Sequence, residues 1–307
     1  MKKNQLGTSD LYISEIGIGC MSLGMDVEKG VRIIHEALHT GVNFLDTADL
    51  YDFGINEEIV GKAINGRRDE VIVATKVGNR WNENKDSWIW DPSANYIKAE
   101  VKESLRRLRT DYIDLYQLHG GTIDDPIDET IGAFEDLKKE GLIRYYGISS
   151  IRPNVINEFV KKSNIVSVMM QYSLLDRRPE ELFPLLKENQ ISVIARGPLA
   201  KGLLTEKMKD KSTAQVIEKG YLDYSYEEIA GVNRKMQDLL ISPQTINSVA
   251  LRYPLFDETV ASIIPGASSV EQIRENVQET TNNQITKEQY DKLQEITKSC
   301  IYEQHRV

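Results

Sequence analysis

The sequence predicts an α/β protein of the (β/α)8 TIM barrel class, in which each of eight strands is followed by a helix. Short apolar runs alternate with amphipathic segments along nearly the whole chain, which is typical of a parallel sheet covered by helices. The runs number eight, and eight strand–helix units close a barrel. Barrels of this size are routinely single domains, so we expect residues 1–307 to form one domain.

Each element has its own signal in the sequence. The predicted strands are 16–19, 42–45, 71–75, 112–118, 142–148, 166–170, 191–195 and 260–264. The predicted helices are 28–40, 56–64, 93–109, 128–139, 153–162, 180–188, 244–252 and 270–280. Helix 28–40 illustrates the reasoning, because Val31, Ile34 and Leu38 lie on one face and Gly41 ends the helix.

Three segments lie outside the eight units. Residues 1–15 contain two short runs around a turn, which predicts a hairpin over the barrel floor. Residues 203–242 form a long insertion after the seventh strand, with a helical pattern at 226–240, and residues 286–298 predict a C-terminal helix. Long loops at the C-terminal rim of a barrel usually carry substrate contacts or lids.

Composition restricts the partners. The 38 basic and 47 acidic residues give a net charge of −9, which argues against nucleic acid or an anionic membrane surface as a partner. No apolar stretch follows the N-terminal lysines, and no segment is apolar enough to span a membrane. Cys20 and Cys300 make no disulfide framework. We therefore expect a cytoplasmic protein that acts on a small molecule, and the sequence does not fix its oligomeric state.

Three successive predicted strands have an ionisable residue at or just past their C-terminal ends. The second strand leads to Asp46, with Tyr51 in the loop beyond, the third leads to Lys76 and the fourth to His119. The C-terminal ends of parallel barrel strands meet at one rim, so these four groups should lie together. Each alone is more often a structural cap or ion pair, but a carboxylate, a phenol, an ammonium and an imidazole together predict a proton-transfer site.

All three tryptophans, Trp81, Trp88 and Trp90, lie in the loop 77–91 directly after Lys76. Large aromatic side chains beside a reactive centre suggest a wall of the substrate site, although packing of the loop onto the barrel explains them equally well. We take Trp81 and Trp88, together with Tyr51 and His119, as candidate substrate-binding residues.

Two sequence motifs match known functional patterns but do not predict those functions here. The run His35-Glu36-Ala37-Leu38-His39 matches the H-E-x-x-H helix of zinc proteases, but the helix belongs to the outer layer and His39 is expected to face solvent. The run Gly17-Ile18-Gly19-Cys20-Met21-Ser22 starts like a dinucleotide fingerprint, yet Ser22 stands at the third glycine position. We expect neither a metal site nor a Rossmann fold.

Six segments together resemble the aldo-keto reductase superfamily over nearly the whole chain. They are Asn43-Phe44-Leu45-Asp46-Thr47-Ala48 with Tyr51, Thr75-Lys76, Asp114-Leu115-Tyr116-Gln117-Leu118-His119, Tyr146-Gly147-Ile148-Ser149, Gly197-Pro198-Leu199-Ala200 and Ile264-Pro265-Gly266-Ala267. Each segment is weak alone, but six in the right order at predicted strand ends are specific. The resemblance implies a barrel that binds NADP(H) across its rim and reduces aldehyde or ketone carbonyls.

The resemblance also implies a catalytic tetrad of Asp46, Tyr51, Lys76 and His119, with Tyr51 as the proton donor. A free phenol has a pKa of ~10 and is a poor acid at neutral pH, and an ammonium fixed by a carboxylate favours the phenolate. His119 would orient the carbonyl oxygen or share the proton, and the cofactor would supply the hydride.

The implied cofactor contacts fall into four groups along the rim. The first strand contributes Gly19, Cys20 and Met21, next to Asp46. The nicotinamide would contact Ser149, Ser150 and Gln171, with Arg196 stacking where many members have an aromatic residue. The pyrophosphate would contact Gly197, Pro198, Leu199, Ala200, Gly202 and Lys207. The adenosine end would contact Gly266, Ser268, Gln272, Glu275 and Asn276.

One departure from the family bears on the choice of cofactor. Ser268 and Ser269 replace arginines often found near the 2′-phosphate, with Arg274 and Lys207 as possible substitutes for their charge. The adenosine-site pattern resembles that of the potassium-channel β subunits, which bind NADP(H). An alternative function is therefore a nucleotide-sensing regulatory subunit with little turnover, against which His119 counts because the regulatory branch departs at that position.

Overall fold

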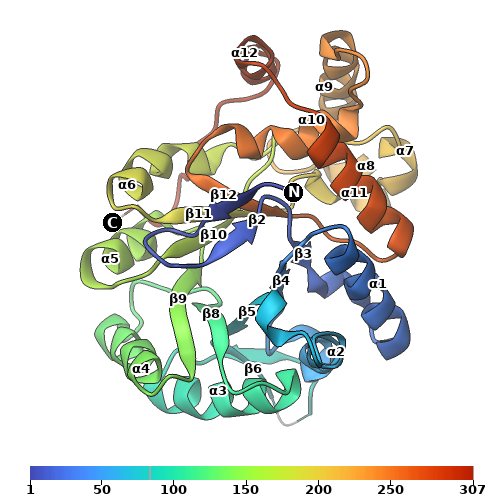
Figure 1. The fold of residues 1–307 in the computed structure, drawn as a ribbon. Helices are drawn as coiled ribbons and strands as arrows, with labels where there is room; N and C mark the ends of the chain where they lie inside the picture. The colour runs from blue at the N-terminus through green and yellow to red at the C-terminus, as the bar shows by residue number, and fades with distance from the viewer. Residues whose placement is uncertain (83, 307) are drawn as a thin grey trace.

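A parallel eight-stranded barrel forms the centre of the molecule. The computed structural model describes residues 1–82 and 84–306. The barrel strands, in spatial order, are β3 (Ile18–Gly19), β4 (Phe44–Asp46), β5 (Ile72–Val77), β8 (Ile113–Leu118), β9 (Ile143–Ser149), β10 (Ser167–Gln171), β11 (Ser192–Arg196) and β12 (Val260–Ile264). Parallel bridges from Ile16 to Ile263 and from Gly19 to Gly266 join the first strand to the last (Figure 1). The predicted (β/α)8 barrel is confirmed.

Helices surround the barrel, and the predicted ones are present with small differences at their ends. They are α1 (Val27–His39), α2 (Ile55–Ala63), α3 (Ala94–Leu108), α4 (Ile127–Lys139), α5 (Pro153–Lys162), α6 (Phe183–Glu188), α10 (Ile246–Arg252) and α11 (Val270–Asn282). Side-chain caps fix several starts: Asp26, Ser93 and Ser269 each accept a backbone N–H from the first turn of α1, α3 and α11. Helix α6 starts later than predicted because the 3₁₀ turn Arg178–Leu182 precedes it.

The N-terminal hairpin plugs the barrel floor. Strands β1 (Lys3–Gln5) and β2 (Tyr12–Ser14) pair antiparallel and lie across the face turned to the viewer in Figure 1. The hairpin residues Leu6, Leu11 and Ile13 are buried in a separate apolar cluster with residues from the barrel interior. Gly7 adopts a φ of +55°, and a Cβ there would lie 2.3 Å from the Val166 carbonyl oxygen, so a larger residue would push the hairpin off the floor.

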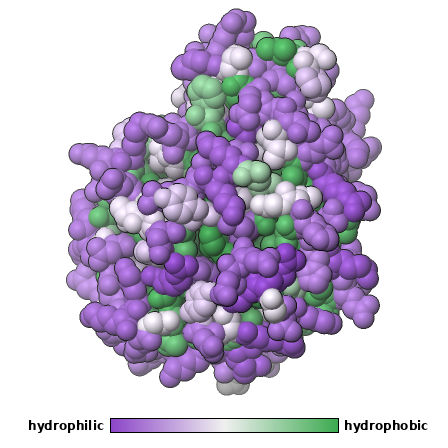
Figure 2. Space-filling view, in the orientation of Figure 1, coloured by the Kyte–Doolittle hydropathy of each residue, from purple (hydrophilic) through white to green (hydrophobic). Residues whose placement is uncertain are grey.

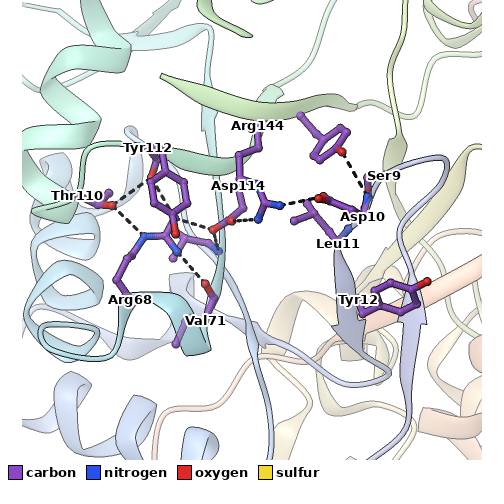
Figure 3. Close-up of polar contacts among 12 residues, drawn as sticks. Ser9, Asp10, Leu11, Tyr12, Arg68, Val71, Thr110, Tyr112, Asp114 and Arg144 are labelled. Atoms are coloured by element: carbon purple, nitrogen blue, oxygen red, sulfur yellow. Dashed lines mark hydrogen bonds and ion pairs between the residues drawn. The ribbon is translucent and has the colours of Figure 1, made fainter. Parts of the chain in front are cut away.

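A buried carboxylate ties the floor together (Figure 3). Asp114, at the start of β8, accepts hydrogen bonds from the Arg68 guanidinium at 2.6 Å, the Val73 N–H at 2.9 Å and the Arg144 guanidinium at 3.1 Å. Arg144 also pairs with Asp10 of the hairpin turn at 2.9 Å. Ion pairs therefore link the hairpin to β9 and β8, and the Val73 N–H links this cluster to β5.

Further elements extend the opposite, C-terminal rim. The insertion contains α7 (Met208–Lys211), α8 (Ala214–Lys219) and α9 (Tyr226–Leu239), and the predicted C-terminal helix is α12 (Lys287–Glu295). The loop 77–91 contains an antiparallel hairpin, β6 (Asn79–Trp81) with β7 (Trp88–Trp90), which the sequence pattern did not predict.

The surface of the floor side is mainly hydrophilic, with apolar residues scattered over it rather than gathered in one area (Figure 2). The helices that the structure describes include none with the length and apolar character needed to cross a bilayer.

Candidate active site

A cavity of about 1790 Å³ lies at the C-terminal ends of the barrel strands. Its walls come from the strand ends, from the β6–β7 hairpin, from the insertion and from residues 298–305. Ligand pockets typically measure ~300–1,000 Å³, so this cavity is large enough for an extended cofactor together with a second molecule.

Lys76 stands at the base of this cavity as a buried cation. Its Nζ donates hydrogen bonds to Asp46 Oδ2 and to the Thr47 carbonyl oxygen, both at 2.7 Å. Burial by itself would lower the pKa of Lys76, but the neighbouring Asp46 and Tyr51 outweigh burial and raise that pKa. The side chain is therefore a permanent ammonium at physiological pH, and two of its three N–H groups are fixed by protein oxygens.

The remaining direction of the Lys76 ammonium points to Tyr51. The Tyr51 hydroxyl oxygen lies 3.4 Å from Nζ, and its ring meets the His119 ring edge-on with centroids 5.8 Å apart. A tight turn follows directly, in which Asp52 and Phe53 adopt φ values of 49° and 59°. The structure thus brings together the four side chains predicted as a tetrad.

His119 is a neutral imidazole in this setting. Burial, together with the positive charges of Lys76 and Arg196, lowers its pKa to about 3. Its Nδ1 is buried without a hydrogen-bond partner among the described residues. At physiological pH the ring can therefore donate or accept a hydrogen bond, but it cannot supply a proton as imidazolium.

Most residues predicted to contact the cofactor line the cavity. They are Gly19, Met21, Asp46, Ser149, Ser150, Gln171, Arg196, Gly197, Pro198, Leu199, Gly202, Lys207, Gly266, Ser268, Gln272, Glu275 and Asn276. Cys20 and Ala200 are fully buried and do not belong to this lining. Their side chains pack in the core, so contact with a cofactor at these two positions stays a prediction that concerns their backbone atoms.

Gln171 and Arg196 form a fixed pair at the ends of β10 and β11. Arg196 Nη1 donates to Gln171 Oε1 at 3.0 Å, and Gln171 Nε2 donates to Asp176 at 2.9 Å and to the Tyr221 hydroxyl at 3.1 Å. These bonds fix which side of the Gln171 amide is the donor. Arg196 is exposed to the cavity, so its planar guanidinium is free to stack on a ring.

The start of α11 forms the far end of the cavity. The Ser268 backbone N–H donates to Gln272 Oε1 at 2.8 Å, and a Cβ on Gly266 would lie 2.4 Å from Ser22 Oγ, so Gly266 permits a close approach of two loops. Arg274 pairs with Glu36 on the outside and does not line the cavity, so it does not replace the missing arginine charge. Lysine side chains near the seventh strand do line it, at Lys201, Lys207 and Lys211.

The three tryptophans have different roles. Trp88 is 55% exposed and lines the cavity, and Trp90 lines it as well. Trp90 also packs over Gly78, where a Cβ would lie 2.6 Å from its ring. Trp81 donates its indole N–H to the Leu50 carbonyl at 3.0 Å and packs on Phe53, with ring centroids 4.5 Å apart. Trp81, predicted as a substrate contact, instead stabilises the loop outside the cavity lining.

The C-terminal segment 298–305 lines the cavity and was not predicted from the sequence. The Lys298 N–H donates to the Tyr224 hydroxyl at 2.6 Å, the Tyr302 N–H to Glu181 at 2.8 Å, and the Asn154 N–H to the His305 carbonyl at 2.8 Å. These bonds hold the segment along the cavity wall. It has no regular secondary structure, so no periodic signal in the sequence marks it.

The H-E-x-x-H run lies on the outer helix α1. His35 Nε2 lies 3.0 Å from the Ala63 carbonyl oxygen. The part of the chain that the structure describes contains no group of three or more His, Cys, Asp or Glu side chains arranged to hold a metal ion.

The barrel, the position of the cavity and the four converging groups agree with the comparisons to known proteins. The model of the aldo/keto reductase family matches residues 15–298, so the chain belongs to this family. It is thus an oxidoreductase, and its family binds nicotinamide cofactors.

Individual relatives match most or all of the chain. The uncharacterized oxidoreductase YqkF of Bacillus subtilis (strain 168) is 59% identical over 307 residues, which is 100% of both chains. The holo form of aldo-keto reductase AKR11C1 from Bacillus halodurans has a TM-score of 0.93 at 56% identity, again covering 100% of both chains. The NADH-specific methylglyoxal reductase of Escherichia coli (strain K12) is 34% identical over 302 residues, covering 90% of this chain and 93% of the relative.

Proposed function

We propose that this protein is an NADP(H)-dependent reductase of aldehydes and ketones, in which Tyr51 donates the proton to the developing alcohol. The observation that supports it is the position of the Tyr51 hydroxyl, 3.4 Å from the Lys76 ammonium, which Asp46 holds at 2.7 Å. A cation fixed beside a phenol stabilises the phenolate that proton donation leaves behind.

His119 completes the proposed reaction site. Because its imidazole is neutral, it acts by hydrogen bonding to the substrate carbonyl oxygen rather than by donating charge. The carbonyl would then receive two polar contacts, one from the phenol and one from the imidazole, while Lys76 acts through Tyr51. One positioned donor of this kind is typically worth ~3–4 kcal/mol in the transition state.

The cavity fits a nicotinamide dinucleotide, which supplies the hydride when bound. Gln171 Oε1, oriented by Arg196, is an acceptor for a carboxamide N–H, the loop 197–202 lines the cavity where a pyrophosphate would lie, and the α11 N-terminus offers a site for a phosphate. The preference for NADP(H) is supported by the α11 N-terminus, which favours a 2′-phosphate, and by Lys207 on the wall. The proposed substrate is a small carbonyl compound, with an apolar or aromatic group against Trp88 and Trp90.

The proposal places the protein in the cytoplasm, as a single domain over residues 1–307. Both cysteines, Cys20 and Cys300, are free thiols, which suits a reducing compartment.

Replacing Tyr51 with Phe tests the chemistry. Tyr51→Phe removes the proton donor and leaves the aromatic ring, so we expect kcat to fall by at least about 10²-fold, in line with loss of a general acid. The dissociation constant of NADPH, measured by titration calorimetry, should change less than about threefold, because the hydroxyl faces the substrate side. Steady-state reduction of a panel of aldehydes and ketones provides the kinetic measurement.

Two results would contradict the proposal. Substantial activity of Tyr51→Phe would remove Tyr51 from its role. Tight nucleotide binding with no turnover on the whole panel would instead favour the nucleotide-sensing alternative.

A further inference from the structure

A second buried carboxyl, Asp49, lies behind the reactive loop, and the proposed reaction does not use it directly. Asp49 comes two residues before Tyr51 and is only 7% exposed. The Asp49 backbone N–H donates to the Lys76 carbonyl oxygen at 3.3 Å. This bond joins the loop that contains Tyr51 to β5 at Lys76, whose ammonium contacts the Tyr51 hydroxyl. The Asp49 side chain turns outward, away from the cavity, towards α3.

The Asp49 carboxyl has two hydrogen-bond donors, the Leu50 backbone N–H and the Tyr96 hydroxyl, and no cation beside it among the described residues. Oδ2 accepts a hydrogen bond from the Tyr96 hydroxyl at 3.2 Å, and Oδ1 is buried without a partner among the described residues. No ion pair reaches Asp49 within the described part of the chain, since Lys76 is paired with Asp46 and Arg107 with Glu57 and Glu100. An isolated carboxylate in such a place would be very costly, and proteins usually neutralise the group instead.

The surroundings strengthen this argument. The titratable groups that interact with Asp49 are Glu57 on α2, Tyr96 and Glu100 on α3, and Tyr116 on β8. The nearby cations are engaged elsewhere, because Arg107 pairs with Glu57 and Glu100 and the Lys76 ammonium pairs with Asp46. Tyr116 is fully buried, and its hydroxyl also has no partner among the described residues. Burial, followed by the negative charges of Glu57 and Glu100, raises the pKa of Asp49 well above its ordinary value.

We propose that Asp49 is a positioning residue that keeps the Tyr51 loop in its reactive place as a protonated, neutral carboxylic acid. This inference rests on the proposed function only in the identity of the reaction that the loop serves. As a neutral acid, Asp49 accepts the Tyr96 hydrogen bond and has one O–H of its own to donate. An ionised Asp49 would repel Glu57 and Glu100 and push the loop towards the cavity.

Two substitutions at Asp49 separate neutral positioning from the alternatives. Asp49→Asn is neutral and of the same shape, so we expect kcat within about threefold of the parent. Asp49→Leu has a similar size without polar atoms, so we expect kcat to fall about ten- to hundredfold, as misplacement of a reacting group by about 1 Å does. The calorimetric dissociation constant of NADPH should stay within about threefold in both. A loss of kcat in Asp49→Asn as large as that in Asp49→Leu would overturn the proposal.

Two further readouts do not depend on turnover. The infrared spectrum of the parent should contain a protonated-carboxyl C=O band that Asp49→Asn lacks, and absence of that difference would overturn the neutral assignment. Amide hydrogen exchange in residues 47–54 should accelerate in Asp49→Leu and not in Asp49→Asn. If the protein reduced no carbonyl compound, the proposed function would fail. The infrared and hydrogen-exchange measurements would still decide whether Asp49 is protonated and whether it holds the loop in place.

The floor carboxylate Asp114 provides a matched control. It is also buried, but it is paired with Arg68 and Arg144 in the cluster at the barrel floor (Figure 3). Asp114→Asn should lower the midpoint of unfolding and leave kcat unchanged, whereas Asp49→Asn should change neither. A loss of kcat in Asp114→Asn would show that any buried carboxyl affects the loop, and would overturn the specific role of Asp49.

Discussion

At the scale of single residues, the neutral state of His119 links the site to stability. Its pKa falls from an ordinary 6.5 to about 3 in the folded chain. Between these values the unfolded chain binds more protons than the folded one, so the free energy of unfolding decreases as pH falls. The loss begins near the ordinary value and continues down to the folded one.

His119→Gln tests this linkage, because Gln keeps hydrogen-bonding capacity and does not titrate. From about pH 7.5 to about pH 5, His119 should contribute a loss of up to about 2 kcal/mol in the free energy of unfolding. Urea denaturation followed by circular dichroism at both pH values should show a smaller loss for His119→Gln than for the parent. An equal loss in the two proteins would mean that His119 titrates normally in the folded state.

At the scale of elements, the start of α11 sets the expected choice between the two dinucleotides. Ser268 lines the cavity, and both its backbone N–H and its hydroxyl contact Gln272 Oε1. A carboxylate at this position would repel a 2′-phosphate, and juxtaposed like charges cost several kcal/mol. We therefore expect Ser268→Asp to raise the dissociation constant of NADPH at least about tenfold and that of NADH less than about threefold.

Calorimetric titration of both nucleotides checks this expectation, with Ser268→Asn as the uncharged control. If Ser268→Asp weakened the binding of NADPH and NADH equally, the 2′-phosphate would not lie near Ser268. The α11 N-terminus would then not explain a preference for NADP(H).

At the scale of the whole molecule, a buried ion pair lies where the first barrel strand, β3, meets the last, β12. Arg252 of α10 donates to Glu15 at 2.9 Å and to the Thr280 carbonyl at 3.2 Å, and both charged side chains are under 10% exposed. Glu15 precedes β3, the first barrel strand, whereas Thr280 belongs to α11. The pair therefore connects the two ends of the strand order.

Arg252→Met should lower the free energy of unfolding by about 3–5 kcal/mol, because Glu15 would be left buried without its partner. The double variant Arg252→Met/Glu15→Leu should recover much of this loss. The exposed pair of Lys187 and Glu258 is the control, and Lys187→Met should cost under about 1 kcal/mol. Urea denaturation measures all three, and no recovery in the double variant would assign the loss to packing.

The elements that the sequence predicted well are those with a strong period. Helix α1 and strand Ile113–Leu118 lie where the apolar pattern predicts them, although in α1 Val31 and Leu38 of the predicted stripe are only half-buried while Ile34 is fully buried. The strand pattern also predicts Lys76 and His119 at or just past strand ends, with Tyr51 in the loop beyond the Asp46 strand. The β6–β7 hairpin was missed because its strands are only three residues long and its outer face is exposed. Segment 298–305 was missed because long-range hydrogen bonds, not local pattern, fix it in place.

Burial explains the remaining differences. The resemblance assigned Cys20 and Ala200 to the cofactor by position along the chain, but position does not tell which way a side chain points, and both side chains pack in the core, so only their backbone could meet a cofactor. The same limit applies to Trp81, which contacts Phe53 instead of the cavity. Asp49 gave no signal at all, because its environment comes from α2, α3 and β8 together.

The clustering of every indole in residues 81–90 has a practical consequence for spectroscopy. Tryptophan emission from this protein originates in one hairpin beside the cavity mouth. The emission should therefore change when a ligand enters the cavity, and it should be insensitive to changes at the barrel floor and in the outer helices. A change of tryptophan emission in denaturant therefore reports the unfolding of that hairpin. The barrel unfolds in the same step only if the emission curve and the far-ultraviolet circular dichroism curve coincide.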